Sequence, residues 1–179
     1  MSTSADQQGP GQDLSTWAIE RLQSFAMDAR GRQLEAVRIV AQGHAYHSDQ
    51  PQEDRRQWAK LSLLANRRMH SDSTGDQSRA VQQDFMLRMW VIDQLGPDDK
   101  DPGWSPETLA SETIAALDLT PPQASALAGR WRDLAIEQIR DLRRLKNLTA
   151  HLDRLINHIE PSPTRDQLLI WTELRRLLP

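Results

Sequence analysis

Five basic side chains near the C-terminal end of the chain have types and spacing suited to binding phosphate. They are Arg140, Arg143, Arg144, Lys146 and Arg154. In a helix, intervals of three and four residues place side chains on one face, and guanidinium groups bind phosphate oxygens in pairs. The pattern predicts a basic helical face that could follow a nucleic-acid backbone. The alternative is a solvated face held by local pairs, such as Glu137 with Arg140.

A leucine seam on the same segment predicts a surface for another helix. Leu145, Leu148, Leu152, Leu155 and Ile159 alternate by three and four, as the a and d positions of a coiled coil do. Upstream, Gln138 and Asp141 occupy the seam positions, and Ile139 and Leu142 move the apolar stripe sideways. Either this is an ordinary bundle helix packed by its neighbours, or it pairs with a second copy or a partner protein. The second interpretation assigns partner contacts to Ile139, Leu142 and Leu145.

The tryptophans are a further source of binding surface. Five of them lie on apolar stripes, which favours anchoring in a core over stacking on bases; these are Trp17, Trp58, Trp90, Trp131 and Trp171. Trp104 differs because it lies in an acidic loop between Gly103 and Ser105. We therefore add Trp104 to the predicted partner contacts.

Residue patterns for catalysis or metal binding are weak. The absence of cysteine excludes disulfides, thiol catalysis and zinc ribbons. His44 and His47 with Asp49 form a sparse metal set without a second ligand cluster. No phosphate-binding loop, dinucleotide fingerprint or nucleophile-elbow motif occurs. We expect no enzyme, no metal and no cofactor, and the sequence assigns the chain to no family.

Helices must position all of these residues, and the longest is predicted over 121–160. Thr120 and Gln123 form a capping box at its start, and no strong stop follows before Pro161. A second capping box opens a last helix over 164–178. Because the connection is short, we expect a C-terminal antiparallel helical hairpin.

The preceding chain is also predicted to be helical. The expected ranges are 13–46, 51–69, 76–95 and 106–117. We favour one continuous helix over 13–46 with a weak point at Gly31, and Gly96 is a strong stop. No segment alternates as a strand does. The prediction is an all-α elongated bundle of about five to six helices, forming a single domain over 13–179 after a disordered tail, 1–12.

Composition limits the classes of function. The 179 residues carry 22 basic and 25 acidic side chains, a net charge of −3, and only 38% are hydrophobic. Residues 130–179 hold 10 basic and 7 acidic side chains, so this part alone is net +3. No apolar run is long enough to span a membrane, and the N-terminus lacks a signal-peptide pattern. We expect an intracellular, cytoplasmic protein with no membrane contact.

Two functions remain open. The first is a non-enzymatic α-helical interaction protein, acting as a scaffold, adaptor or regulatory subunit of a larger assembly. It would bind a protein partner or a second copy through the long helix. The alternative is a helical nucleic-acid-binding subunit that contacts phosphates through the basic face. The observation that distinguishes the two functions is whether the basic face is open or is covered by the acidic N-terminal helices.

Overall fold

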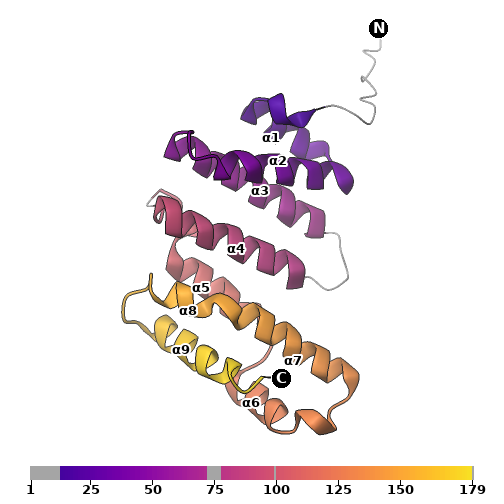
Figure 1. The fold of residues 1–179 in the computed structure, drawn as a ribbon, viewed down its shortest axis with the longest axis vertical. Coiled ribbons are helices and arrows are strands. Elements are labelled where there is room, and N and C mark those ends of the chain that lie inside the picture. The colour runs from indigo at the N-terminus through magenta and orange to yellow at the C-terminus, as the bar shows by residue number, and fades with distance from the viewer. Residues whose placement is uncertain (1–12, 72–77, 99, 179) are drawn as a thin grey trace. The chain divides into compact units, whose positions relative to one another are not determined.

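The computed structural model describes residues 13–71, 78–98 and 100–178 and confirms the all-α prediction. Those ranges contain helices and no strand, as the ribbon shows (Figure 1). The predicted disordered tail, 1–12, lies outside the described residues. The chain divides into two compact units, 1–72 and 73–179, and each is described by itself. No helix in the described ranges is both long and apolar enough to cross a membrane.

The first unit is built on two helices that pack along each other, α2 and α3. Its elements are η1 (Leu14–Thr16), α1 (Ile19–Asp28), α2 (Arg32–Tyr46) and α3 (Gln52–Ser71). The prediction of one continuous helix over 13–46 is wrong, because the chain turns at Gly31. The φ of Gly31 is +49°, which side-chain-bearing residues rarely adopt.

The second unit holds the segment with the basic residues and the leucine seam. Its elements are α4 (Ser78–Leu95), η2 (Pro102–Trp104), α5 (Pro106–Ala115), α6 (Pro121–Gly129), η3 (Trp131–Asp133), α7 (Ile136–Leu148), η4 (Thr149–His151), α8 (Leu152–Ile156) and α9 (Pro163–Arg175). The predicted stop at Gly96 is confirmed: its φ is +75°, and its amide donates to the carbonyl of Ile92.

The predicted continuous helix over 121–160 is wrong, because this segment is divided into α6, α7 and α8. The start is as expected: the Thr120 amide donates to Gln123 Oε1 at 2.9 Å. The backbone then leaves the helical region at Arg130 and is extended at Leu134 and Ala135. The Ala135 amide donates to Gln138 Oε1 at 3.3 Å, which starts α7. The break lets α6 pack against both α7 and α9.

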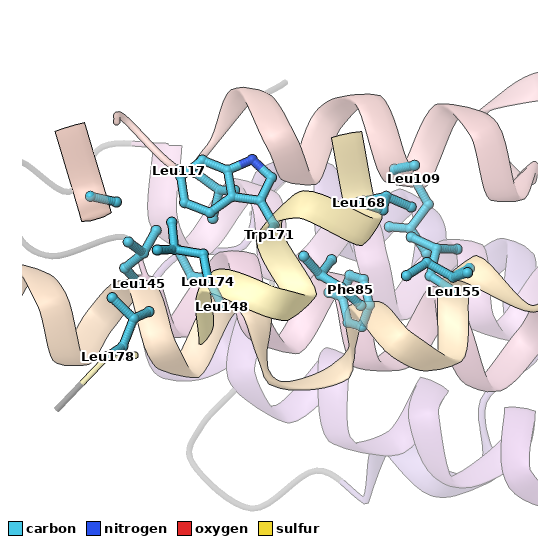
Figure 2. Close-up of a cluster of buried hydrophobic side chains, with 14 of the residues drawn as sticks. Phe85, Leu109, Leu117, Leu145, Leu148, Leu155, Leu168, Trp171, Leu174 and Leu178 are labelled. Atoms are coloured by element: carbon cyan, nitrogen blue, oxygen red, sulfur yellow. The ribbon is translucent and has the colours of Figure 1, made fainter. Parts of the chain in front are cut away.

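One apolar cluster joins the helices of the second unit. Trp171 is buried in one cluster with leucines from α5, α7 and α9. Figure 2 shows Leu117, Leu174 and Leu145 on the side of its indole ring, whereas Leu109 lies farther away, beside Leu168. The chain reverses after α8, and α9 packs against it. The hydroxyl of Ser162 caps α9 by accepting from the Arg165 amide at 3.3 Å, so the capping residue lies two positions before the predicted one, Thr164.

A buried arginine links three elements of the same unit. Arg88 of α4 is almost fully buried. Its guanidinium pairs with Glu112 of α5 and with Asp84, and it donates to the carbonyl of Gly103 in η2 at 2.6 Å. The short connection that carries Trp104 is therefore fixed to α4 and α5.

Candidate functional site

One face of α7 is exposed and basic. Ile136, Arg140, Arg143 and Asn147 follow one another at intervals of four, three and four residues, and all four are exposed. Such spacing keeps them on one side of the helix. Arg140 and Arg143 make no ion pair with another residue in the described ranges. Within the second unit, this part of the predicted basic face is therefore left uncovered.

The other basic residues of the predicted face are engaged within the unit. Lys146 Nζ donates to the carbonyl of Leu178 at 2.9 Å. Arg154 pairs with Asp93 of α4, and His158 Nε2 lies 2.8 Å from the other oxygen of that carboxylate. The continuous basic stripe is therefore not formed, and an acidic residue of α4 occupies its C-terminal end.

Trp131 lies immediately before α7 and is the exception among the tryptophans predicted to anchor a core. Its side chain is 41% exposed. The guanidinium carbon of Arg132 lies 5.6 Å from the centre of its indole ring, within the range of a cation–π contact. Arg130 and Arg132 are both exposed on either side of it, as is the acidic Asp133. An aromatic ring beside two cations is thus presented to solvent.

A pocket of about 280 Å³ opens between α7 and the segment that joins α5 to α6. We call it the leucine groove; its lining residues are Leu117, Asp118, Leu119, Leu127, Gln138, Asp141, Arg144, Leu145 and Leu148. The floor is buried and belongs to the cluster around Trp171, as Figure 2 shows for Leu117, Leu145 and Leu148. Leu119 and Leu127 are half-buried and form its walls.

The rim of the leucine groove is polar and carries two carboxylates. Gln138, Asp141 and Arg144 come from α7, and Asp118 comes from the connection between α5 and α6. Asp118 has a φ of +55°, a conformation that aspartate tolerates better than most side chains. Neither Asp118 nor Asp141 pairs with a cation of the described chain. The groove thus offers an apolar floor and unpaired negative charge above it.

The predicted partner residues lie mostly inside the unit. Leu142 and Leu145 are buried, Ile139 is half-buried, and Trp104 is only 5% exposed. Leu142 and Trp104 therefore pack into the core, Ile139 does so only in part, and of the four only Leu145 reaches the groove, from its floor. The groove opens instead at the interrupted seam positions, Gln138 and Asp141.

Sequence reasoning missed the other wall of the groove. The residues of this wall lie 9 to 19 positions before Ile136, the first residue of α7: Leu117, Asp118, Leu119 and Leu127. They reach it only because the chain breaks after Gly129. That glycine at the end of α6, together with the two polar seam residues, was the available sequence signal.

His44, from the sparse metal set, makes structural contacts in the first unit. His44 stacks on Trp58 with 4.3 Å between ring centres. Its Nε2 lies 3.1 Å from the Ser15 carbonyl, and its Nδ1 lies 3.2 Å from Gln50 Nε2. Both ring nitrogens are thus engaged within the unit. The described ranges contain no group of three His, Cys, Asp or Glu residues that could hold a metal ion.

Known proteins give no assignment. Comparison of the chain with protein-family models, curated proteins and solved structures finds no match. No residue role is carried over from a relative. The leucine groove and the exposed start of α7 are therefore interpreted from their own geometry.

Proposed function

We propose that this chain is a non-enzymatic helical interaction protein, a scaffold, adaptor or regulatory subunit of a larger assembly. Its leucine groove receives an amphipathic helix from a partner protein. The observation that carries the proposal is the interrupted seam of α7. From Leu145 onward the seam is buried, whereas at Gln138 and Asp141 it borders an open pocket with a leucine floor. A helix laid there would extend the core.

The chemistry of the groove describes the partner. A helix that docks in an apolar groove does so through side chains spaced by three, four and seven residues. Each buried Leu or Ile contributes about 1.5–3 kcal/mol before the entropy cost of association is subtracted. The carboxylates of Asp118 and Asp141 select Lys or Arg beside the apolar ridge and disfavour acidic side chains there. The partner segment is therefore an amphipathic helix with a basic flank.

Synthetic helices test this proposal directly. Two peptides would share one leucine ridge and differ only in a Lys or a Glu flank. We expect the Lys peptide to bind the full chain and to shift the methyl signals of Leu117, Leu127 and Leu148 in NMR spectra. Asp141→Lys should reverse the preference to the Glu peptide. Equal binding of both peptides, or shifts elsewhere in the chain, would remove the groove from the proposal.

A second candidate function is binding of single-stranded nucleic acid at the start of α7. It is favoured by the exposed Trp131 with Arg132 beside its ring. Proteins that bind single strands combine stacking aromatics with cations along the backbone. Arg140 and Arg143 supply further cations on the exposed face of the adjoining helix. Asp133 and Glu137 lie on the same segment and reduce its net charge.

Fluorescence anisotropy with labelled oligo-dT and a matched duplex tests this second function. We expect the single strand to bind more tightly, and Trp131→Ala to cost about 1–3 kcal/mol of affinity. Arg143→Gln should lower the salt dependence by about 0.7 of a log unit per log unit of salt. Arg154→Gln is the control, since that residue is held by Asp93. Failure to bind at low salt would exclude the function.

A further inference from the structure

Helix α9 has apolar side chains on two opposite sides. Its inner side places Leu168, Trp171 and Leu174 in the core of the second unit. Its outer side exposes Leu169 by 45% and Ile170 by 51%, and Leu177, just past the helix end, is 62% exposed. Exposed aliphatic side chains that recur along one helix mark an interaction surface more often than scattered ones do.

The outer side of α9 carries an acidic residue at one end and a basic residue at the other. Asp166 lies in the first turn of α9 and Arg176 is its C-cap, and both are exposed. Neither pairs with another residue of the described chain. Their separation of ten residues corresponds to about 15 Å along the helix. Between them lie the two exposed aliphatic residues and Glu173.

These two features are self-complementary. In an antiparallel pair of identical helices, the two-fold axis crosses both helices at the height of one residue. A residue a given number of positions before that height faces the residue the same number of positions after it in the other copy. With that level at Trp171, Asp166 of each copy lies opposite Arg176 of the other. A parallel pair would instead place each charge beside its own kind. At the same level Glu173 of each copy faces Leu169 of the other. The two end charges are therefore satisfied by a second copy in the antiparallel orientation and not in the parallel one.

We infer that the outer face of α9 pairs antiparallel with α9 of a second copy of this chain. Because α9 has 13 residues, it spans only about 20 Å. The contact is smaller than the roughly 1,200–2,000 Å² of a stable interface. The dimer is therefore weak, reversible and dependent on concentration. It uses no residue of the leucine groove, so it stands independently of the proposed function.

Sedimentation velocity of the full chain over a wide concentration range measures the association. We expect a reversible monomer–dimer equilibrium, weakened at least about fivefold by Asp166→Arg and likewise by Arg176→Asp, because each single change creates two like-charge pairs. The double variant should restore the dissociation constant to within about twofold of the original chain. An equimolar mixture of the two single variants should form a mixed dimer.

The helix dipole separates this result from an effect on folding. Asp166 and Arg176 lie at the helix ends that favour their charges, so reversing both charges weakens α9 more than reversing either one. Dimerisation is expected to recover in that same double variant. Ile170→Lys should abolish the dimer while the chain still binds the Lys-flanked peptide.

Three results would overturn the inference. These are a monomer at every concentration, an association insensitive to Ile170→Lys, and a double variant that associates no better than the single ones. The first excludes the dimer, and the other two place it on a different surface. Loss of peptide binding in a groove variant would leave the dimer unchanged.

Discussion

Nε2 of His158 lies 2.8 Å from Oδ1 of Asp93. This contact joins the segment that follows α8 to α4. The other carboxylate oxygen pairs with Arg154. Arg154, a member of the basic face predicted to meet a polyanion, is thus paired inside the unit. Asp93 is mostly buried, whereas Arg154 is about half exposed, so solvent screens part of the interaction.

Asp93→Ala tests the strength of this connection. We expect the free energy of unfolding to fall by about 1–2 kcal/mol, because two charge-assisted contacts are lost. Urea denaturation followed by circular dichroism measures the change. Asp153→Ala on α8 is the control, an exposed carboxylate that should cost less than about 0.5 kcal/mol. Equal losses in both variants would mean that Asp93 does not hold the end of α8.

Arg88→Met should be among the most damaging single changes in the second unit. The guanidinium is almost fully buried and serves Glu112, Asp84 and Gly103 together. Removing one partner of such a set leaves the others unsatisfied, at a cost of about 3 kcal/mol. Glu112→Gln should cost less than half as much, because Glu112 is half exposed and Arg88 keeps its other partners. Chemical denaturation of both variants gives the comparison.

Two glycines of the first unit should respond oppositely to alanine. Gly31 has a φ of +49°, so Gly31→Ala should destabilise the chain by about 1–2 kcal/mol. Gly43 lies inside α2 with no atom within 4 Å of an added Cβ, so Gly43→Ala should stabilise it by about 0.5–1 kcal/mol. Thermal unfolding of the two variants checks both signs. Stabilisation by both would show that α1 and α2 form one helix after all.

Asp141→Leu should close the leucine groove. The new side chain would continue the buried seam of α7 against Leu117 and Leu127, and filling such a space adds about 0.5–2 kcal/mol of stability. The same change should abolish binding of the Lys-flanked peptide. Asp141→Asn removes the charge without filling the space. It should therefore weaken binding of the Lys-flanked peptide and leave the free energy of unfolding nearly unchanged. Calorimetry and peptide titration of both variants separate the two effects.

Trp131→Phe should remove the tryptophan emission most easily quenched by acrylamide. Trp131 is 41% exposed, whereas Trp17, Trp58, Trp104 and Trp171 are at most 9% exposed. The change should alter stability by less than about 0.5 kcal/mol, as expected at a surface position. Trp104→Phe should leave the quenchable emission in place. It should lower the free energy of unfolding by more than about 1 kcal/mol, because it opens a cavity. Stern–Volmer plots with urea titrations test both.

Local chemistry made several helix ends predictable. The Thr120–Gln123 capping box and the stop at Gly96 depend on atoms within four residues along the chain. Such contacts form whatever the rest of the fold does. The break between α6 and α7 was missed, although Gly129 lies at its start. Arg130 to Ala135 contains no proline, and Ala135 has no side chain that could cap a helix.

The sequence alone determined that this protein is all-α and which residues start and end several of its helices. Tertiary structure decided how the functional residues are used. Lys146 and Arg154 look equivalent to Arg143 in sequence, yet Leu178 and Asp93 engage only the first two. The groove likewise needs Leu117 and Leu127 to meet Gln138 and Asp141. The periodicity of a sequence predicts on which face of its own helix a side chain lies. It does not predict which residue that side chain contacts, because that residue comes from a segment distant in the chain.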